Sequence, residues 1–454
     1  MQGIIDALLT FSDWLWGIPM LVILVGGSLF LTIRLGFVQF RHFGFAMKET
    51  FGKIFHKQEG EGTVSPFQAA TAALASTIGA SNIVGVPVAI AFGGPGAVFW
   101  MWVVALIGCA AKISEIVLGI RYRSLNEAGE YVGGPMYYLR GIKGGLGKAL
   151  SIIFAFFLMI ELIPSIAAQS LSAVQTASTL NIPPIVIAVL LVLPVALFVF
   201  GGIKTLGSFT EKLVPFMALT YLVGGIAVII SNIGNLPGAV ADIFRYAFTP
   251  AAAVGGFGGA AVAQAIRWGT ARGVYSNEAG MGTAPIAHSG AITDHPMRQA
   301  MWGVFEIVVD TLIVCTVTAL VVLTSGLYQV LPSSEAASIP ARAFQALLGD
   351  GVGGVIVTAS IFLFVLSTIT VIAWYGKTQA EFLFGRTFGN IMVVVYIGAI
   401  VAGAYIELGV IYRFLDLLLA TIIIPNMIGL VLLSGEVKTL KDEFFGNPDY
   451  FKKG

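Results

Sequence analysis

The sequence predicts an all-α integral membrane protein, in which ten of eleven spanning helices form two five-helix repeats of inverted topology. Three observations support this prediction: an apolar composition, an alternation of charge between apolar segments, and two interrupted spans. Hydrophobic residues make up 57% of the 454 residues, charged residues make up 11%, and the mean hydropathy is +0.91. Soluble domains carry about 25% charged residues, so the chain is expected to lie in a lipid bilayer.

Eleven segments are long and apolar enough to cross a membrane, because a spanning helix needs about 20 apolar residues. They cover residues 14–36, 66–92, 96–121, 148–179, 184–204, 211–232, 250–272, 298–325, 351–376, 389–407 and 410–433. The resulting division has an extra N-terminal spanning helix with a cytoplasmic loop, two five-helix repeats and a cytoplasmic tail. These parts comprise residues 1–65, 66–232, 233–433 and 434–454.

Positive charge alternates between the connections that join these spans. Of the 25 Lys and Arg residues, 19 lie on one set of connections, whereas Arg245, Arg342 and Arg413 lie on the other. Cytoplasmic loops are enriched in Lys and Arg. The pattern therefore predicts a multi-pass protein of the cell membrane, with its N-terminus outside and its C-terminus in the cytoplasm.

The second predicted span is interrupted by small and polar residues between Ser76 and Asn82. Unpaired backbone groups cost several kcal/mol in hydrocarbon, so unwound backbone at this depth indicates a bound polar ligand or ion. Amides at the start of a half-helix suit a carboxylate. The alternative for the hydroxyl groups is a bond to their own helix. We expect six residues here to contact a substrate: Thr77, Ile78, Gly79, Ala80, Ser81 and Asn82.

A second interruption is expected in the seventh span, where residues 251–260 contain four glycines and one aromatic residue. Gly255, Gly256 and Gly258 would offer bare carbonyls to an ammonium group, and Phe257 would wall the pocket. Close helix packing through small residues is the alternative. The two interrupted spans each open a block of five, a pattern typical of inverted-repeat transporters with a site at the midplane.

The position of this second interruption is left open between Gly255–Gly259 and Ser276–Gly280. We favour Gly255–Gly259, because the other position places Arg267 and Arg272 in the membrane interior. Asn277 and Glu278 would then lie at or below the cytoplasmic face and act in gating. With the break at Ser276–Gly280 they would touch the substrate instead.

Other polar residues within spans are functional candidates, since charges in the bilayer are costly. Gln169 lies near the middle of the third core helix, which also contains Glu161, and is expected to bind substrate or a neighbouring helix. Lys112 and Glu115 lie three residues apart and are expected to pair. We interpret the charged residues as a cytoplasmic closing network in which Glu306 and Asp310 meet arginines of the seventh span. The predicted gating residues are Lys112, Glu115, Arg267, Arg272, Asn277, Glu278, Glu306 and Asp310.

Three stretches resemble the alanine or glycine:cation symporter family. They are GGPGAVFWMWVVALIG (Gly93–Gly108), the preceding ALASTIGASNIVGVPVAIAFGGPG, and GVYSNEAGMGTAPIAHSGA (Gly273–Ala291). The resemblance extends over essentially the whole chain. It implies a LeuT-like fold of ten core helices plus one extra N-terminal helix. It also implies symport of a small neutral amino acid, alanine or glycine, by alternating access, with sodium or a proton as the coupling ion.

The same resemblance implies a sodium site between the first and eighth core helices. Carried over by position, the site takes the carbonyls of Ala75, Ile78 and Phe364 with the hydroxyls of Ser367 and Thr368. Thr370 is a competing hydroxyl, and bonds to the helix's own carbonyls are the alternative.

Two alternatives for the function stay open: a LeuT-fold symporter of another small organic solute, and a proton-coupled amino acid carrier. The chain has no HExxH, GxSxG or GxxxxGK[ST] motif, so an enzyme is not expected. The net charge of +1 predicts no nucleic-acid partner. The expected partners are the amino acid substrate and the lipid bilayer, without an obligate protein partner.

Overall fold

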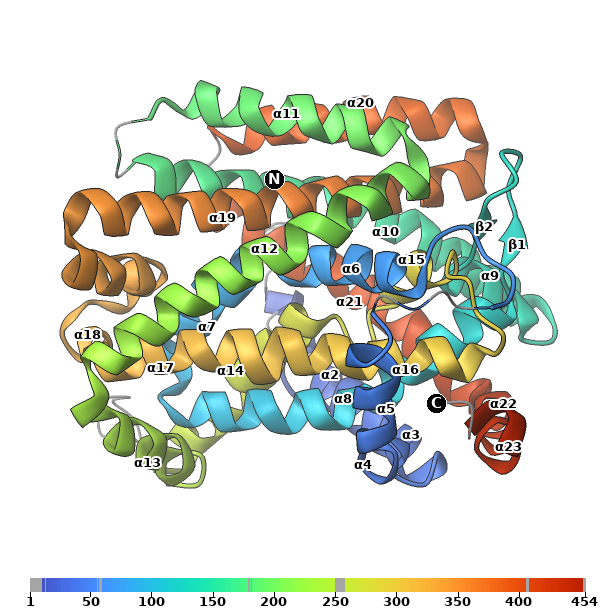
Figure 1. Ribbon diagram of the computed structural model, residues 1–454, viewed down its shortest axis with the longest axis horizontal. Coiled ribbons are helices and arrows are strands. Elements are labelled where there is room, and N and C mark those ends of the chain that lie inside the picture. Colours follow the sequence, from blue (N-terminus) through green and yellow to red (C-terminus); the bar gives the residue numbers. More distant parts are fainter. Residues whose placement is uncertain are drawn as a thin grey trace.

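The structure is a computed structural model that describes residues 10–451 except 13, 55, 57–58, 179, 181, 250–257 and 406–407. In this part of the chain long helices run side by side in one bundle (Figure 1). One short hairpin pairs β1 (Ser124–Leu125) with β2 (Tyr131–Val132) in antiparallel register. The described structure is therefore helical except for this hairpin and the connecting loops.

The helices follow in chain order, with η marking 3-10 and π-helical segments. The first half contains α2 (Ile18–Leu21), η1 (Val22–Gly26), α3 (Gly27–Arg34), α4 (Val38–Arg41), α5 (Phe43–Phe51), α6 (Pro66–Thr77), η2 (Ser81–Gly85), α7 (Val86–Gly93), α8 (Gly96–Arg121), α9 (Pro135–Tyr138), η3 (Leu139–Gly141), α10 (Gly145–Ser178), α11 (Pro184–Phe200) and α12 (Gly202–Ser231). The second half contains η4 (Ile233–Asn235), α13 (Leu236–Tyr246), α14 (Gly258–Asn277), α15 (Ala284–His288), α16 (Pro296–Ile307), η5 (Val308–Cys315), α17 (Thr316–Ser325), α18 (Leu327–Val330), η6 (Ser333–Ser338), α19 (Ile339–Phe384, kinked at Gly349), α20 (Arg386–Gly403), α21 (Leu408–Leu432), α22 (Ser434–Gly446) and α23 (Pro448–Phe451).

Seven helices in the described part of the chain are long and apolar enough to cross a membrane. The number becomes eight if the bent pair Pro66–Thr77 and Ser81–Gly93 forms one span. Two further apolar helices, Ile18–Arg34 and Pro184–Phe200, are shorter. The prediction of an all-helical chain with several membrane spans is confirmed, and the count of eleven stays a prediction.

The first predicted break is confirmed. Ser65 caps the start of helix α6. Its Oγ accepts a hydrogen bond from the Gln68 backbone amide at 3.1 Å, and the Gln68 side-chain oxygen accepts one from the Ser65 backbone amide at 3.1 Å. This capping box and Pro66 fix the start of the helix. The helix ends at Thr77, and the next helical segment begins at Ser81 with its axis turned by 47°. The unwound backbone is thus confined to a few residues.

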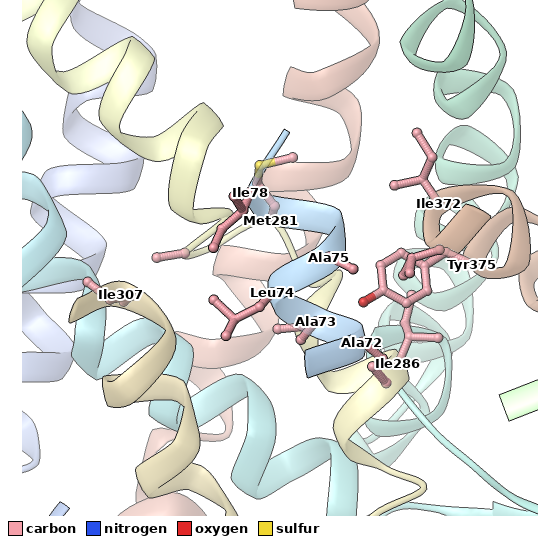
Figure 2. Packing of buried hydrophobic residues seen from close by; sticks show 14 of the residues in the cluster. Ala72, Ala73, Leu74, Ala75, Ile78, Met281, Ile286, Ile307, Ile372 and Tyr375 are labelled. Atoms are coloured by element: carbon pink, nitrogen blue, oxygen red, sulfur yellow. The ribbon is translucent and has the colours of Figure 1, made fainter. Parts of the chain in front are cut away.

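Helix α6 lies at the centre of the bundle. Its alanines Ala72, Ala73 and Ala75 are fully buried, and their small side chains let neighbouring helices approach closely. Figure 2 shows apolar side chains from several other elements around this helix. They include Met281, Ile286, Ile307, Ile372 and Tyr375. The broken end of α6 is therefore surrounded by protein and not by lipid.

The structure shows a break at residues 278–283, which overlaps the alternative position Ser276–Gly280 that we did not favour. Helix α14 is continuous from Gly258 to Asn277, and α15 begins at Ala284. Between them Glu278, Gly280 and Gly282 have φ of 56°, 88° and 81°. Positive φ suits glycine and ends a helix. Gly258 and Gly259 are helical, whereas Gly255, Gly256 and Phe257 lie outside the described residues.

The environment of two arginines on α14 bears on our reason for not favouring a break at this position. Arg267 and Arg272 line a cavity together with Trp16, Trp268 and Asp416. Their charges are thus accommodated next to aromatic and acidic residues, and the objection that placed the break elsewhere does not apply.

We expect Gly282→Ala to destabilise the protein by about 1–3 kcal/mol, because it adds strain at positive φ and overpacks the site. A Cβ at this position would lie 2.5 Å from Pro135 Cγ and 2.9 Å from Phe154 Cε2. The measurement is the apparent Tm of the purified protein in detergent. Gly398→Ala is the matched control, since a Cβ there meets nothing within 4 Å. Equal Tm values for the two variants would contradict the geometry of the second break.

Candidate functional site

A cavity lies between the two breaks, and five parts of the fold contribute to its wall. The first break supplies hydroxyl groups, the second supplies Glu278, and α10 supplies a second carboxyl group and an amide. Helices α19 and α21 close the remaining sides. The lining residues of this central cavity are Ser76, Ser81, Glu161, Leu162, Ser165, Gln169, Tyr275, Glu278, Met281, Thr283, Thr368, Ile372 and Leu419. Polar groups therefore converge where both helices lose their regular hydrogen bonds.

Side chains satisfy the unwound amides of the first break. The Gly79 amide donates to Asn82 Oδ1 at 3.0 Å, and the Ala80 amide donates to Gln169 Oε1 at 3.3 Å. Both acceptors are side-chain oxygens, so these amides are oriented to bind a carboxylate oxygen. Thr77 instead donates to Leu74 O at 3.1 Å, the bond within its own helix that we considered as an alternative. Gln169 joins α10 to the break, which is the contact with a neighbouring helix that we considered, and it also lines the cavity. Its contact with a substrate stays a prediction.

Three oxygen atoms meet between the end of α6 and the middle of α19. Thr368 Oγ1 donates to Ala75 O at 2.9 Å and lies 3.4 Å from Ile78 O. The approach requires a glycine nearby, because a Cβ on Gly79 would lie 2.8 Å from Thr368 Oγ1. Hydroxyl and carbonyl oxygens of this kind suit a hard cation. In the described part of the chain no cluster of His, Cys, Asp and Glu suits a metal ion.

The other members of the predicted sodium set lie on the same stretch of α19. Ser367 Oγ donates to Phe364 O at 2.8 Å, so both atoms currently bond to each other within one turn. Thr370, the competing hydroxyl, donates to Leu366 O at 2.6 Å. The structure therefore brings Thr368, Ala75 and Ile78 together directly. Phe364 and Ser367 belong to the adjacent turn of the same helix.

Asp310 of η5 is bonded to Asn82 next to the first break. It does not join a network with the arginines of α14, which corrects our expectation. Its carboxyl accepts bonds from Asn82 Nδ2, Ser276 Oγ and Thr311 Oγ1, each at 2.7 Å. Because the oxygen of the Asn82 amide holds Gly79, this side chain joins the unwound amide to a buried carboxyl. Asn82 therefore links the first break to α14 and η5.

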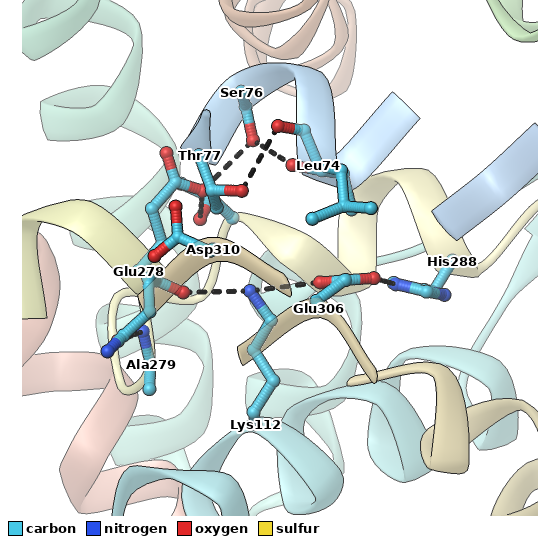
Figure 3. Close-up of polar contacts among 12 residues, drawn as sticks. Leu74, Ser76, Thr77, Lys112, Glu278, Ala279, His288, Glu306 and Asp310 are labelled. Atoms are coloured by element: carbon cyan, nitrogen blue, oxygen red, sulfur yellow. Dashed lines mark hydrogen bonds and ion pairs between the residues drawn. The ribbon is translucent and has the colours of Figure 1, made fainter. Parts of the chain in front are cut away.

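The predicted pair of Lys112 and Glu115 does not form. Lys112 Nζ lies 3.1 Å from Glu306 Oε2 and donates to the Asn277 carbonyl at 2.9 Å. Glu306 in turn contacts His288, as Figure 3 shows. Glu115 Oε1 accepts the Gly282 amide at 2.9 Å and the Asn426 amide at 2.7 Å. These two α8 side chains thus satisfy the backbone on either side of the second break.

Glu278 connects the two breaks. Its Oε2 accepts the Thr283 hydroxyl at 2.6 Å. It also accepts the hydroxyl of Ser76, which Figure 3 labels together with Glu278, at 3.1 Å. The neighbouring Asn277 accepts the Ala279 amide at 3.0 Å and donates to Thr311 at 3.3 Å. Glu278 therefore faces the central cavity, whereas our interpretation placed it below the membrane face in a gate.

Several lining residues were missed in the sequence. Glu161, 2% exposed, is bonded to the Ser165 hydroxyl at 2.5 Å and faces the cavity. A carboxyl in a predicted span was the signal that pointed to it. Met281 and Thr283 lie in the break at residues 278–283 and also line the cavity. His288 and Asn426 do not line it, but they contact Glu306 and Glu115 from elements far along the chain. Their positions depend on tertiary packing that no local pattern reveals.

The comparisons with known proteins agree with this geometry. The model of the sodium:alanine symporter family matches residues 1–451. The chain is 50% identical over 444 residues to the uncharacterized transporter YflA of Bacillus subtilis, covering 97% of this chain and 94% of that protein. It is 42% identical over 435 residues to the sodium/alanine symporter AgcS of Methanococcus maripaludis, covering 94% of each chain.

One solved structure shows the same fold. The crystal structure of MhsT in complex with L-phenylalanine matches with a TM-score of 0.60 at 14% identity, over 82% of this chain and 89% of that chain. At this identity the match shows the LeuT-like fold alone. The family match covers nearly the whole sequence and confirms the resemblance of the three sequence stretches. The chain thus belongs to the sodium:alanine symporter family, and it is a multi-pass membrane transporter and not an enzyme.

Proposed function

We propose that this protein imports a small neutral amino acid, alanine or glycine, together with sodium, by alternating access. The central cavity between the two helix breaks carries this proposal, because it combines unwound backbone with carboxyl and hydroxyl groups. A zwitterion needs partners for both of its charges, and this cavity offers both kinds. Its family membership supports the same substrate class and ion.

The substrate carboxylate binds at the amides of Gly79 and Ala80 in this proposal. There it replaces the side-chain oxygens of Asn82 and Gln169, which hold those amides in the structure. The ammonium group faces Glu278 and Glu161, which line the same cavity. The predicted contacts of residues 77–82 and of Gln169 are kept, whereas the second-break contacts move from Gly255–Gly258 to residues 278–283.

Sodium binds at Thr368 Oγ1 with the carbonyls of Ala75 and Ile78. Thr368 Oγ1 already lies 2.9 Å from Ala75 O and 3.4 Å from Ile78 O. Phe364 O and Ser367 Oγ complete the shell once their mutual bond opens. Because these carbonyls lie at the end of α6, where the unwound segment begins, ion binding and substrate binding stabilise the same backbone conformation. Their coupling is then reciprocal.

The membrane orientation is part of the proposal. Figure 1 places α13 and α18 at one end of the bundle and the hairpin β1–β2 with α22 and α23 at the other. The second end carries most connections that are rich in Lys and Arg, so we assign it to the cytoplasm and the N-terminus to the outside. Lys112, Glu115 and Glu306 hold the second break closed in this conformation.

Proton coupling is the second candidate, and one observation favours it. Glu161 is a buried carboxyl that faces the cavity and is bonded to a serine hydroxyl. Such a group can carry a proton in place of a metal cation.

Reconstitution decides between these candidates. The purified protein in liposomes is given labelled L-alanine under an inward sodium gradient or an inward proton gradient. Uptake above equilibrium with sodium alone is expected. Uptake with the proton gradient alone would show that the coupling ion is a proton and not sodium. If neither alanine nor glycine is taken up under either gradient, the proposed function is contradicted.

Thr368→Val is expected to raise the sodium concentration for half-maximal uptake about tenfold or more, since one ligand to a charged group is lost. The valine keeps the volume of the side chain. Thr370→Val is the matched control, because its hydroxyl bonds to its own helix at 2.6 Å. A sodium dependence of Thr368→Val that equals that of the control would move the ion site elsewhere.

Asn82→Ala is expected to abolish concentrative uptake while the protein still folds. The change leaves the Gly79 amide and the Asp310 carboxyl without their shared partner. Uptake into proteoliposomes is measured together with elution from a sizing column. Asn232→Ala serves as the control, since this side chain bonds to its own helix terminus. Normal uptake by Asn82→Ala would show that the first break is not part of the site.

A further inference from the structure

A second cavity lies outside the central cavity and shares part of its wall. It is bounded by η2 and α7, by α10, by α14 and by the segment η6 at the proposed outer end. Ser81, Gln169 and Tyr275 line both cavities and so form the threshold between them. The outer cavity is lined by Ala80, Ser81, Val84, Gly85, Val88, Phe92, Ala168, Gln169, Ser172, Arg272, Tyr275, Ser333 and Ala337.

The two cavities differ in size. Water-sized molecules have about 260 Å³ in the outer cavity and about 30 Å³ in the central one. A site of about 10–15 Å³ on this measure holds one water molecule, so the central cavity is too small for an amino acid in this conformation. The outer cavity has room for a small solute.

The two cavities also differ in charge. Arg272 is the charged side chain among the described residues that line the outer cavity, whereas the central cavity contains Glu161 and Glu278. A zwitterion that moves from one cavity to the other meets positive charge first and negative charge deeper. This polarity orients it with its ammonium group leading and its carboxylate behind.

Arg272 lines a neighbouring cavity together with Asp416, but in the described part of the chain it forms no ion pair with Asp416 or with another carboxylate. Its Nε is buried without a hydrogen-bond acceptor, and its guanidinium lies 5.4 Å from the centre of the Trp268 ring. That ring stacks on Phe92 at 4.9 Å. Arg298 contrasts with it, since Asp294 and Glu49 bind its guanidinium at 2.6 and 3.0 Å.

The stacked rings of Trp268 and Phe92 position the Arg272 guanidinium without neutralising its charge. A charge in a membrane cavity is costly unless an anion or water accompanies it. The planar fork of arginine matches a carboxylate in two parallel hydrogen bonds. The wall next to Arg272 is apolar at Val84, Val88 and Phe92, so it suits a small organic acid better than an inorganic anion.

We propose that the outer cavity is a separate carboxylate-binding site, in which Arg272 holds the amino acid before it passes Gln169 and Tyr275 into the central cavity. This inference rests on the proposed function for the identity of the ligand. It replaces our interpretation of Arg272 as part of a cytoplasmic gate. The chemistry that it requires is a carboxylate, and an ammonium group is not needed for binding at this step.

N-acetyl-L-alanine tests the site, because it keeps the carboxylate and lacks the ammonium group. It is titrated into the purified protein by calorimetry, and it is added as an inhibitor of labelled alanine uptake in proteoliposomes. We expect it to bind wild type and to inhibit uptake without being transported. L-Alaninamide, which lacks the carboxylate, should not inhibit.

Arg272→Gln should abolish both effects of N-acetyl-L-alanine and raise the KM for alanine about tenfold, or ~1.4 kcal/mol. Its maximal rate and its sodium dependence should stay near wild type. Arg272→Lys keeps the positive charge but lacks the planar guanidinium. Its binding of N-acetyl-L-alanine and its KM for alanine should lie between those of wild type and Arg272→Gln. Arg245→Gln is the control for net charge, because Arg245 is exposed on α13 and does not line the cavity.

The outcomes separate this inference from the proposed function. Binding of N-acetyl-L-alanine to wild type but not to Arg272→Gln supports the site even if alanine is not the transported substrate. Equal binding and equal KM in wild type and Arg272→Gln would overturn it, as would absence of binding to wild type. If Arg272→Gln does not fold, the same comparison is made with Arg272→Lys.

Discussion

Buried backbone that has left a helix must find other hydrogen-bond partners, and this requirement organises the structure. At the first break, Asn82 and Gln169 bind two amides. At the second break, Lys112 binds the last carbonyl of α14 and Glu115 binds the Gly282 amide. Opposite charges thus meet the opposite ends of two half-helices, as the helix dipole favours. The polar residues of the spans thus form hydrogen bonds to the backbone of the two breaks even without a ligand.

The same partners connect sites that are distant in the sequence. Asn82 joins the Gly79 amide to Asp310, and Glu278 joins Ser76 to Thr283. The carbonyls of Ala75 and Ile78, which end α6, meet Thr368 of α19. A ligand that displaces one partner therefore changes the hydrogen bonds of the whole centre. Such a shared network gives a physical basis for coupling between an ion and a solute.

The sequence predicted some parts of this site well and others badly. The first break was placed correctly because small polar residues interrupt a long apolar run, and Thr368 followed from the resemblance to a family. For the second break we favoured Gly255–Gly259, which lies mostly outside the described residues, because the alternative would place Arg267 and Arg272 in the membrane interior. The described backbone turns close to that alternative, where Glu278, Gly280 and Gly282 adopt positive φ. Lys112 and Glu115 share a helix face, yet each binds a segment more than 160 residues away, at Asn277 and Gly282. Local spacing cannot reveal partners that only tertiary packing brings near.

The central claim is that the two helix breaks together bind one small zwitterionic solute. The most direct test is a cryo-EM structure of the protein in lipid nanodiscs with L-alanine and sodium. The account predicts alanine density within hydrogen-bond distance of residues 76–82 on one side and 278–283 on the other, with the ion at Thr368. Density for alanine that contacts neither gap, or an α14 that continues unbroken into α15, would contradict it.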